Sequence, residues 1–215
     1  MIPIRKSTEP QILQQYRLQP GAEYDGAGFT PDVKDAIRSQ LVNEQGFLCA
    51  YCMGRIEPDS SSMKIDHWHC QDKYEDEQLD YANLLGCCCG IGNKTSDEYC
   101  DTSKKNSDIQ FNPSNAAHYS RMQIRYKHNG EISSDNSQFD KELNDVLNLN
   151  YSRLKENRKC VWNSVTKELS KISGTAKPAE IGRLLGMWKL KSGGKLQEYC
   201  GVAIYYLEKK LSITQ

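Results

Sequence analysis

The sequence lacks an excess of charge of either sign, because its 215 residues contain 28 Lys and Arg against 28 Asp and Glu. No global positive field therefore attracts a polyanion such as a nucleic acid. A chain of this charge that handles nucleic acid would need a partner to help hold it.

Long apolar runs are also absent. The opening segment turns polar at Ile4-Arg5-Lys6-Ser7, which is unlike a signal peptide. No stretch approaches the length of a membrane-spanning helix. The mean hydropathy of -0.72 indicates a wet surface and long polar loops. We expect a cytoplasmic protein without a membrane partner, and we find no internal repeat or low-complexity tract.

Cysteine is abundant and unevenly placed. Seven of the nine cysteines lie between Cys49 and Cys100, and only Cys160 and Cys200 lie outside. A cytoplasmic compartment keeps thiols reduced, which argues against a disulfide framework. Scattered core cysteines would not crowd in this way, so the crowding favours metal binding.

The pattern of apolar residues predicts an α+β fold that is mainly helical. Thr30-Pro31-Asp32 is typical of a helix start, and apolar residues then recur at helical spacing up to Gly46. Residues 63–67 alternate apolar and polar, which predicts a strand that ends at Asp66-His67. A short helix is expected to open at Asp101.

The second half of the chain has a different composition. Asn129-Gly130 predicts a hairpin turn between two short strands, and helical spacing dominates after it. We expect three parts: an N-terminal arm and helix over 1–44, a cysteine-rich module over 45–113 and a mostly helical domain over 114–215 that docks a partner.

The thiol spacing predicts a structural zinc site. Cys49 and Cys52 have the two-residue gap with which one turn presents both sulfurs to a tetrahedral ion. A second pair would combine Cys100 with one member of the run Cys87-Cys88-Cys89, and spacing alone leaves that member open. Zinc would stabilise a region too polar to fold on apolar burial alone.

A second, harder metal is suggested by the polar residues between the thiols. Asp66 and Asp101 offer the oxygen ligands that Mg²⁺ prefers, and a neutral His67 could take a proton from water. Asn83 could orient the imidazole through its side-chain carbonyl. Lys104 and His69 could contact substrate. This combination of groups points to phosphodiester cleavage.

The order C-x-x-C, Asp66-His67, Asn83, Cys and Cys100-Asp101-x-x-Lys104 resembles the HNH endonucleases, whose core is a zinc-stapled ββα-metal module. More narrowly, the chain resembles the PtuB family of Septu and retron-Septu antiphage systems. Residues 4–10, Leu48 to Cys52, Ile65 to Trp68 with Tyr74, and Asn83 to Gly86 contribute to that likeness. So do Leu147-Asn148-Leu149-Asn150, Leu154 and Arg158.

The resemblance implies a role for each matched residue. His67 would be the general base, Asp66 and Asp101 ligands of Mg²⁺ or Mn²⁺, and Asn83 the middle Asn of the motif. Cys49, Cys52, Cys88 and Cys100 would bind zinc. Many HNH enzymes have His or Asn where this chain has Asp101, so the preferred catalytic metal stays open. The implied partners are a PtuA ATPase resembling ABC or SMC proteins and, in some systems, a retron reverse transcriptase with its RNA–DNA hybrid.

Two other functions fit parts of the sequence. A non-catalytic zinc-binding adaptor would use the cysteine-rich module only to dock a partner or nucleic acid. A redox protein would use Cys49 and Cys52, but it would need a reactive thiol at a helix N-terminus, whereas Gly54 indicates a turn. We therefore expect a metal-dependent HNH endonuclease subunit of a phage-defence complex.

Overall fold

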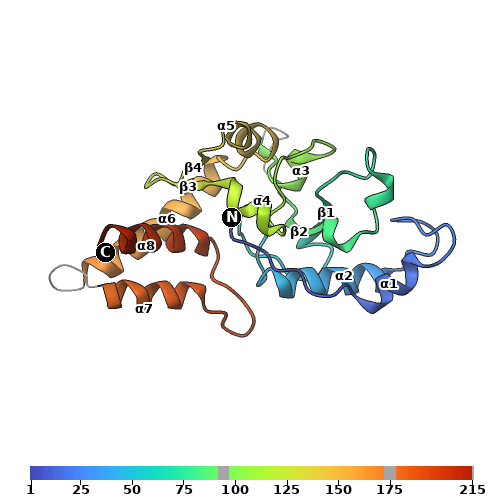
Figure 1. Ribbon diagram of the computed structural model, residues 1–215, viewed down its shortest axis with the longest axis horizontal. Coiled ribbons are helices and arrows are strands. Elements are labelled where there is room, and N and C mark those ends of the chain that lie inside the picture. The colour runs from blue at the N-terminus through green and yellow to red at the C-terminus, as the bar shows by residue number, and fades with distance from the viewer. Residues whose placement is uncertain (92–96, 172–177, 215) are drawn as a thin grey trace.

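The computed structural model describes residues 1–91, 97–171 and 178–214. Figure 1 shows an elongated molecule in which two small sheets lie between helices at either end. The helices are α1 (Gln11–Arg17), α2 (Pro31–Glu44), α3 (Asp101–Lys104), α4 (Ala116–Met122), α5 (Ser137–Lys141), α6 (Ser152–Ser170), α7 (Pro178–Lys189) and α8 (Cys200–Thr214). The strands are β1 (Met63–His67), β2 (Leu84–Cys88), β3 (Ile124–Tyr126) and β4 (Ile132–Ser134). Short turns of other helix types are η1 (Glu75–Glu77), η2 (Tyr81–Asn83) and the π-helical η4 (Glu142–Val146).

Helix α2 begins where the sequence predicts. Pro31 takes the first helical position and Asp32 lies in the first turn, although the Thr30 side chain makes no capping hydrogen bond. The apolar face of α2 is buried and contributes to a cluster that also contains residues of α1 and the start of β2. Gly46 follows the helix with a φ of 60°, a backbone conformation that glycine adopts without strain.

Strands β1 and β2 pair antiparallel, and the short helix α3 follows them in the chain. His67 lies opposite Leu84 at the end of the ladder, and Asp66 lies opposite Leu85. The predicted strand at 63–67 is confirmed. The short helix expected to open at Asp101 is also present, and it ends at Lys104 because Lys105 leaves the helical conformation with a φ of 50°.

The second half has the predicted hairpin and helices. β3 and β4 pair antiparallel around Gly130. Helical spacing from Leu143 onward fits one long helix or two shorter ones. The structure has two separate elements, η4 and α6, because Asn148 between them has a φ of 47°. α7 and α8 pack against each other, and α6 packs on α8.

The main core runs through both halves of the molecule. One cluster of buried residues includes Leu48 and Phe111 from the cysteine-rich stretch together with Leu154 and Leu207 from the helical stretch. The boundaries drawn at 44 and 113 stay predictions, but the segments on either side of 113 share this core. In the described part of the chain, no helix combines the length and apolar character that a membrane crossing requires.

Candidate functional site: a thiol centre beside an acid–imidazole cavity

Four cysteine sulfurs converge from three places: a turn before β1, the end of β2 and the residue before α3. The Sγ atoms of Cys49, Cys52, Cys88 and Cys100 all lie within 4.8 Å of one another. The Cys49–Cys100 and Cys52–Cys88 sulfur pairs are both 3.7 Å apart. Sulfurs at about 2.3 Å from a tetrahedral ion would be about 3.8 Å apart. These four residues could therefore hold a metal ion such as zinc.

Local backbone geometry presents the first two sulfurs. Leu48 and Arg55 form an isolated antiparallel bridge, and the chain turns back between them. The amide of Cys49 donates to the carbonyl of Gly54 at 2.9 Å, and Met53 takes a φ of 65°. The turn that Gly54 indicates is confirmed, but the short strands expected on either side of it are reduced to this single bridge.

Electrostatics favour the ionised form at Cys49, whereas burial raises the pKa of Cys100 well above its ordinary value. Burial would raise the pKa of Cys49, but hydrogen bonds from Cys100, Cys52 and neighbouring thiols bring that pKa well below its ordinary value. Cys87 is buried beside Cys49, and the Cys89 sulfur contacts the carbonyl of Ser61, yet neither belongs to the group of four. The open choice among residues 87–89 thus falls on Cys88.

A cavity of about 370 Å³ opens next to the thiol centre. Asp66 and His67 from the end of β1 and Asp101 from α3 all line it. Cys70, Lys64 and Lys105 lie on the same walls. The structure thus brings together the two acids and the imidazole that the sequence singles out.

His67 is buried and held in one orientation. Its Nε2 lies 2.9 Å from the carbonyl oxygen of Gln78, and the ring packs edge-on against Tyr24. Burial lowers the pKa of His67, so the ring is neutral near pH 7. A carbonyl only accepts hydrogen bonds, so Nε2 must carry the proton, which leaves the lone pair on Nδ1. Within the described residues, no hydrogen bond involves that Nδ1.

Both carboxylates are strongly constrained. Asp66 accepts a hydrogen bond from Tyr51 at 2.5 Å on one oxygen and from the Lys104 ammonium at 3.1 Å on the other. Burial and the negative charge of the adjacent Asp66 raise the pKa of Asp101 to about 7. Lys64 lies 3.7 Å from the Asp101 carboxylate. The acids thus repel each other and are only partly neutralised by lysines.

Asn83 does not orient the imidazole as expected. Its side-chain carbonyl accepts from the backbone amide of His69 at 2.8 Å, and its amide donates to the carbonyls of His69 and Glu77. Asn83 therefore fixes the loop that follows β1. That loop also supplies the Gln78 carbonyl that orients His67.

Lys104 also differs from the expectation that it contacts substrate. Its side chain is fully buried, and its ammonium donates to Asp66 and to the carbonyl of His67 at 2.7 Å. Lys104 comes four residues after Cys100, so its side chain lies on the same face of α3 as Cys100. There the carboxylate of Asp66 attracts its ammonium. Lys104 is thus unavailable to a ligand.

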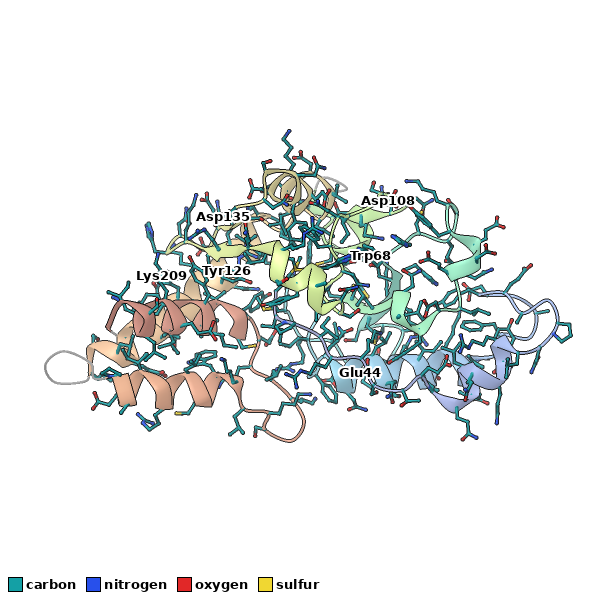
Figure 2. All side chains as sticks on the ribbon, viewed as in Figure 1. Glu44, Trp68, Asp108, Tyr126, Asp135 and Lys209 are labelled. Carbon is teal, nitrogen blue, oxygen red and sulfur yellow. The ribbon has the colours of Figure 1, made fainter. Side chains whose placement is uncertain are left out.

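His69 has partners within the chain. Its ring is stacked between Trp68, labelled in Figure 2, at 3.9 Å and Tyr74 at 4.2 Å. Its Nδ1 lies 2.7 Å from a Glu77 carboxylate oxygen. Both ring faces are therefore covered, and a contact between His69 and substrate stays a prediction.

Sequence reasoning missed two groups that support the site. Tyr51 lies between Cys49 and Cys52 in the sequence. Its position within a predicted pair of metal ligands was the one signal that it supports the site. The Gln78 carbonyl had no signal, because any residue supplies a backbone oxygen. Among the described residues, the four thiols form the only group of three or more metal-ligand side chains whose ligand atoms lie close together. The ligand atoms of Asp66, His67 and Asp101 do not form a second such group.

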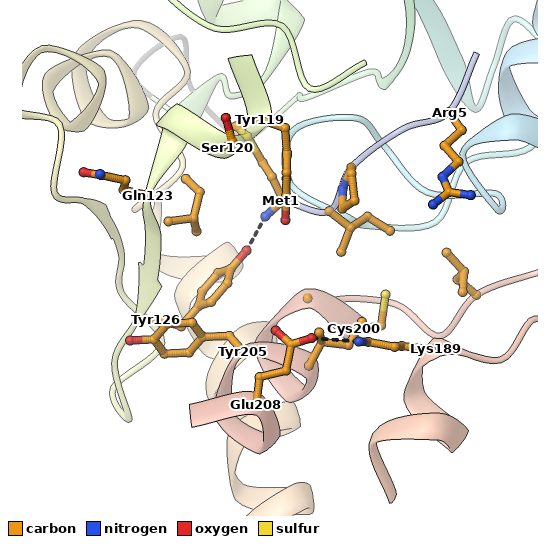
Figure 3. A pocket seen from close by; sticks show the side chains of 16 residues that line it. Met1, Arg5, Tyr119, Ser120, Gln123, Tyr126, Lys189, Cys200, Tyr205 and Glu208 are labelled. Atoms are coloured by element: carbon orange, nitrogen blue, oxygen red, sulfur yellow. Dashed lines mark hydrogen bonds and ion pairs between the residues drawn. The ribbon is translucent and has the colours of Figure 1, made fainter. Parts of the chain in front are cut away.

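A larger cavity, of about 630 Å³, lies elsewhere. Figure 3 shows it between the N-terminal residues, β3 and helix α8, with Tyr119, Tyr126 and Tyr205 around it. It shares no lining residue with the acid–imidazole cavity. Nothing in the sequence predicted this cavity.

No model of a known protein family matches this chain, and no curated protein has a significantly similar sequence. The site therefore defines a class only by its geometry: an α+β protein whose Cys₄ cluster could bind a metal ion beside a cavity lined by two acids and a histidine.

Proposed function

We propose that this chain is a metal-dependent HNH-type endonuclease subunit that hydrolyses phosphodiester bonds of nucleic acid in an antiphage complex with an ATPase partner. The observation that carries the proposal is the state of His67. A neutral imidazole with its proton held on Nε2 by Gln78 keeps its lone pair on Nδ1, and His67 lines a cavity that two acids share. That is the arrangement a general base requires.

In this proposal His67 takes the proton of the attacking water at Nδ1. Asp66 and Asp101 would hold a divalent cation, Mg²⁺ or Mn²⁺. Such a cation supplies charge stabilisation for the phosphorane and the leaving oxygen. Burial and the charge of Asp66 raise the pKa of Asp101, so the nearby lysines do not fully compensate the negative charge of the two acids. A divalent cation would supply the remaining positive charge.

Lys64 and Lys105 replace Lys104 in this proposal as phosphate contacts. Both line the cavity, and their side chains are 43% and 67% exposed. Each also lies near an acid, Asp101 or Glu98, so the cavity has little net positive charge. A partner that grips the substrate is therefore part of the proposal. A PtuA-type ATPase would fill that role, with a retron reverse transcriptase and its RNA–DNA hybrid in some systems.

The thiol centre would bind zinc in a structural role. It adjoins the cavity through α3, which begins immediately after Cys100 and provides Asp101. Zinc bound there would fix the position of one acid relative to β1, without taking part in the cleavage step itself.

The adaptor function is the second candidate, because both oxygens of Asp66 already have protein partners, Tyr51 and Lys104. An adaptor would bind zinc and nucleic acid or a partner without any activity that depends on a divalent cation. It would also be indifferent to the identity of residue 67.

The test is cleavage by the chain purified together with the product of its neighbouring gene. Labelled duplex DNA, single-stranded DNA and RNA are incubated with and without Mg²⁺ and ATP. His67→Ala should lower the cleavage rate about 10²- to 10⁴-fold, the usual contribution of a general base. Zinc content and the folded state should persist.

His128→Ala is the matched control, because His128 is exposed and outside the cavity. Its cleavage rate should equal that of the wild type. Full cutting by His67→Ala would remove His67 from the mechanism. Zinc binding without divalent-dependent cutting of any substrate would favour the adaptor.

A further inference from the structure

Arg158 of α6 is a charged side chain that is only 1% exposed. Its Nε donates to the carbonyl of Gly130 at 2.6 Å, and its terminal nitrogen donates to the carbonyl of Leu149 at 2.7 Å. The amide oxygen of Asn150 lies at 3.3 Å. All these acceptors are neutral, and no ion pair in the described part of the chain includes Arg158. A buried guanidinium without a counter-charge is costly, so its retention requires an explanation.

The loop that holds Arg158 also holds the thiol centre. In the run Leu147 to Asn150, the Leu147 carbonyl accepts from the amide of Cys100 at 2.9 Å. The Asn148 side chain donates to the carbonyl of Glu98 at 2.8 Å. Leu149 and Asn150 then supply acceptors for Arg158. One short loop therefore separates the guanidinium from Cys100.

A second chain of contacts links the same part of α6 to Cys52. Asn157, the residue before Arg158, donates to the hydroxyl of Tyr199 at 2.8 Å. The amide of Tyr199 donates to the carbonyl of Met53 at 3.0 Å. Both halves of the thiol centre are thus tied to the stretch of α6 that carries Arg158.

The chemistry of four thiolates supplies the missing negative charge. A divalent ion bound by four thiolates leaves a formal double negative charge at a buried site. Burial lowers the pKa of Arg158, while negative charge on Cys52 and Cys100 would raise it. The lysines near the thiol module are engaged elsewhere, because Lys104 and Lys64 lie next to Asp66 and Asp101.

We propose that Arg158 is the counter-charge of the metal-loaded Cys₄ centre, so that metal binding holds α6 and the loop 147–150 against the cysteine-rich module. Arg158 is a positioning residue and does not touch the ion. The inference rests on metal binding by the four thiols, which is part of the proposed function, and is independent of cleavage.

The test is a Co²⁺ titration of the apo chain, followed through the thiolate-to-cobalt absorption, with Zn²⁺ competition. Arg158→Gln keeps hydrogen-bond donors but removes the charge, and Arg158→Lys keeps the charge but changes the donor geometry. Arg158→Gln should weaken binding about 10- to 100-fold, the range seen when partners outside the ligand set are lost. Arg158→Lys should retain most of the affinity. Zinc should raise the melting temperature of Arg158→Gln less than that of the wild type.

Lys159→Met is the control, because it removes one positive charge from an exposed position of the same helix. It should bind Co²⁺ like the wild type. Wild-type affinity in Arg158→Gln, or equal weakening by Gln and Lys, would overturn the counter-charge role. If Arg158→Gln is unfolded without metal, metal-induced folding followed by circular dichroism gives the same affinity. A wild-type chain that binds neither ion would instead refute the thiol centre.

Discussion

The thiol centre and the acid–imidazole cavity differ in how their groups are held, although both use α3. The four sulfurs face one another at distances close to those around a tetrahedral ion. In the cavity, each group is bound first to another part of the protein: Asp66 to Tyr51 and Lys104, and His67 to Gln78.

This contrast shows that the two sites depend on different parts of the chain. The thiol centre is specified by its ligands and by the turns that present them. The cavity is specified by residues behind the reactive groups, which fix charge and orientation. Ligand substitutions should therefore have the largest effects at the first site, and substitutions of supporting residues should matter at the second.

The largest effect should follow Cys100→Ser. A structural zinc contributes on the order of 10 kcal/mol to the folding of small modules, so loss of one thiolate should release the ion and unfold the cysteine-rich module. Zinc stoichiometry by atomic absorption and thermal unfolding by circular dichroism measure this. Cys160→Ser, at an exposed position, should change neither quantity. Full zinc content with an unchanged melting curve in Cys100→Ser would refute the assignment.

Lys104→Met should come second, and it tests whether the cavity depends on a supporting residue. Removing one member of a buried ion pair leaves Asp66 without its cation, which typically costs about 3–5 kcal/mol. Urea unfolding should show that loss, while the folded variant still binds zinc. Asp66→Asn in the same chain should recover part of it.

Lys105→Met is the matched control for this pair, since the Lys105 side chain is 67% exposed. It should alter stability by less than about 1 kcal/mol. Equal destabilisation by the two substitutions would mean that the Lys104–Asp66 pair has no special place in the cavity.

Asp101→Asn should give the smallest effect, with a sign that depends on pH. Burial and Asp66 raise the folded-state pKa of Asp101 from 3.8 to about 7. The stability that this raised pKa contributes is present below the unfolded value and is lost as pH rises through about 7. Without divalent cations, Asp101→Asn should therefore be more stable than the wild type near pH 8, and this advantage should shrink toward pH 5.

Mg²⁺ should reverse that order by stabilising the wild type more than the variant. Thermal unfolding at about pH 5 and pH 8, with and without Mg²⁺, measures both effects. Asp108→Asn, an exposed acid outside the cavity, is the control. A variant that loses stability at both pH values would show that the carboxylate is not under strain.

Much of the fold follows from local sequence signals. Pro31, the alternation over Met63–His67 and Pro178 each mark an element that the structure contains. The convergence of Cys49, Cys52, Cys88 and Cys100 also agrees with the ligand set that the family resemblance implied. The spacing of the thiols predicts a metal site because few backbone turns can present two sulfurs to one tetrahedral ion.

The supporting contacts could not be predicted in the same way. Asn83 hydrogen-bonds backbone groups of a loop whose path depends on the whole module, and Lys104 turns inward because of a carboxylate on β1. Such contacts join residues far apart in sequence, and a single sequence does not encode their pairing in any periodic signal. Helical spacing likewise left open whether one helix or two follow Leu143, because the break at Asn148 comes from a positive φ within a loop bound to Glu98.

The brevity of α3 has a consequence for how this protein can vary. Its four residues are flanked by Cys100 and Lys105, whose φ values of 56° and 50° are unfavourable for side chains with a Cβ. Such a turn has little stability of its own. Natural variants should therefore insert or delete residues in the polar loops on either side before they change the length of this turn, because one added residue would rotate Asp101 and Lys104 away from Asp66.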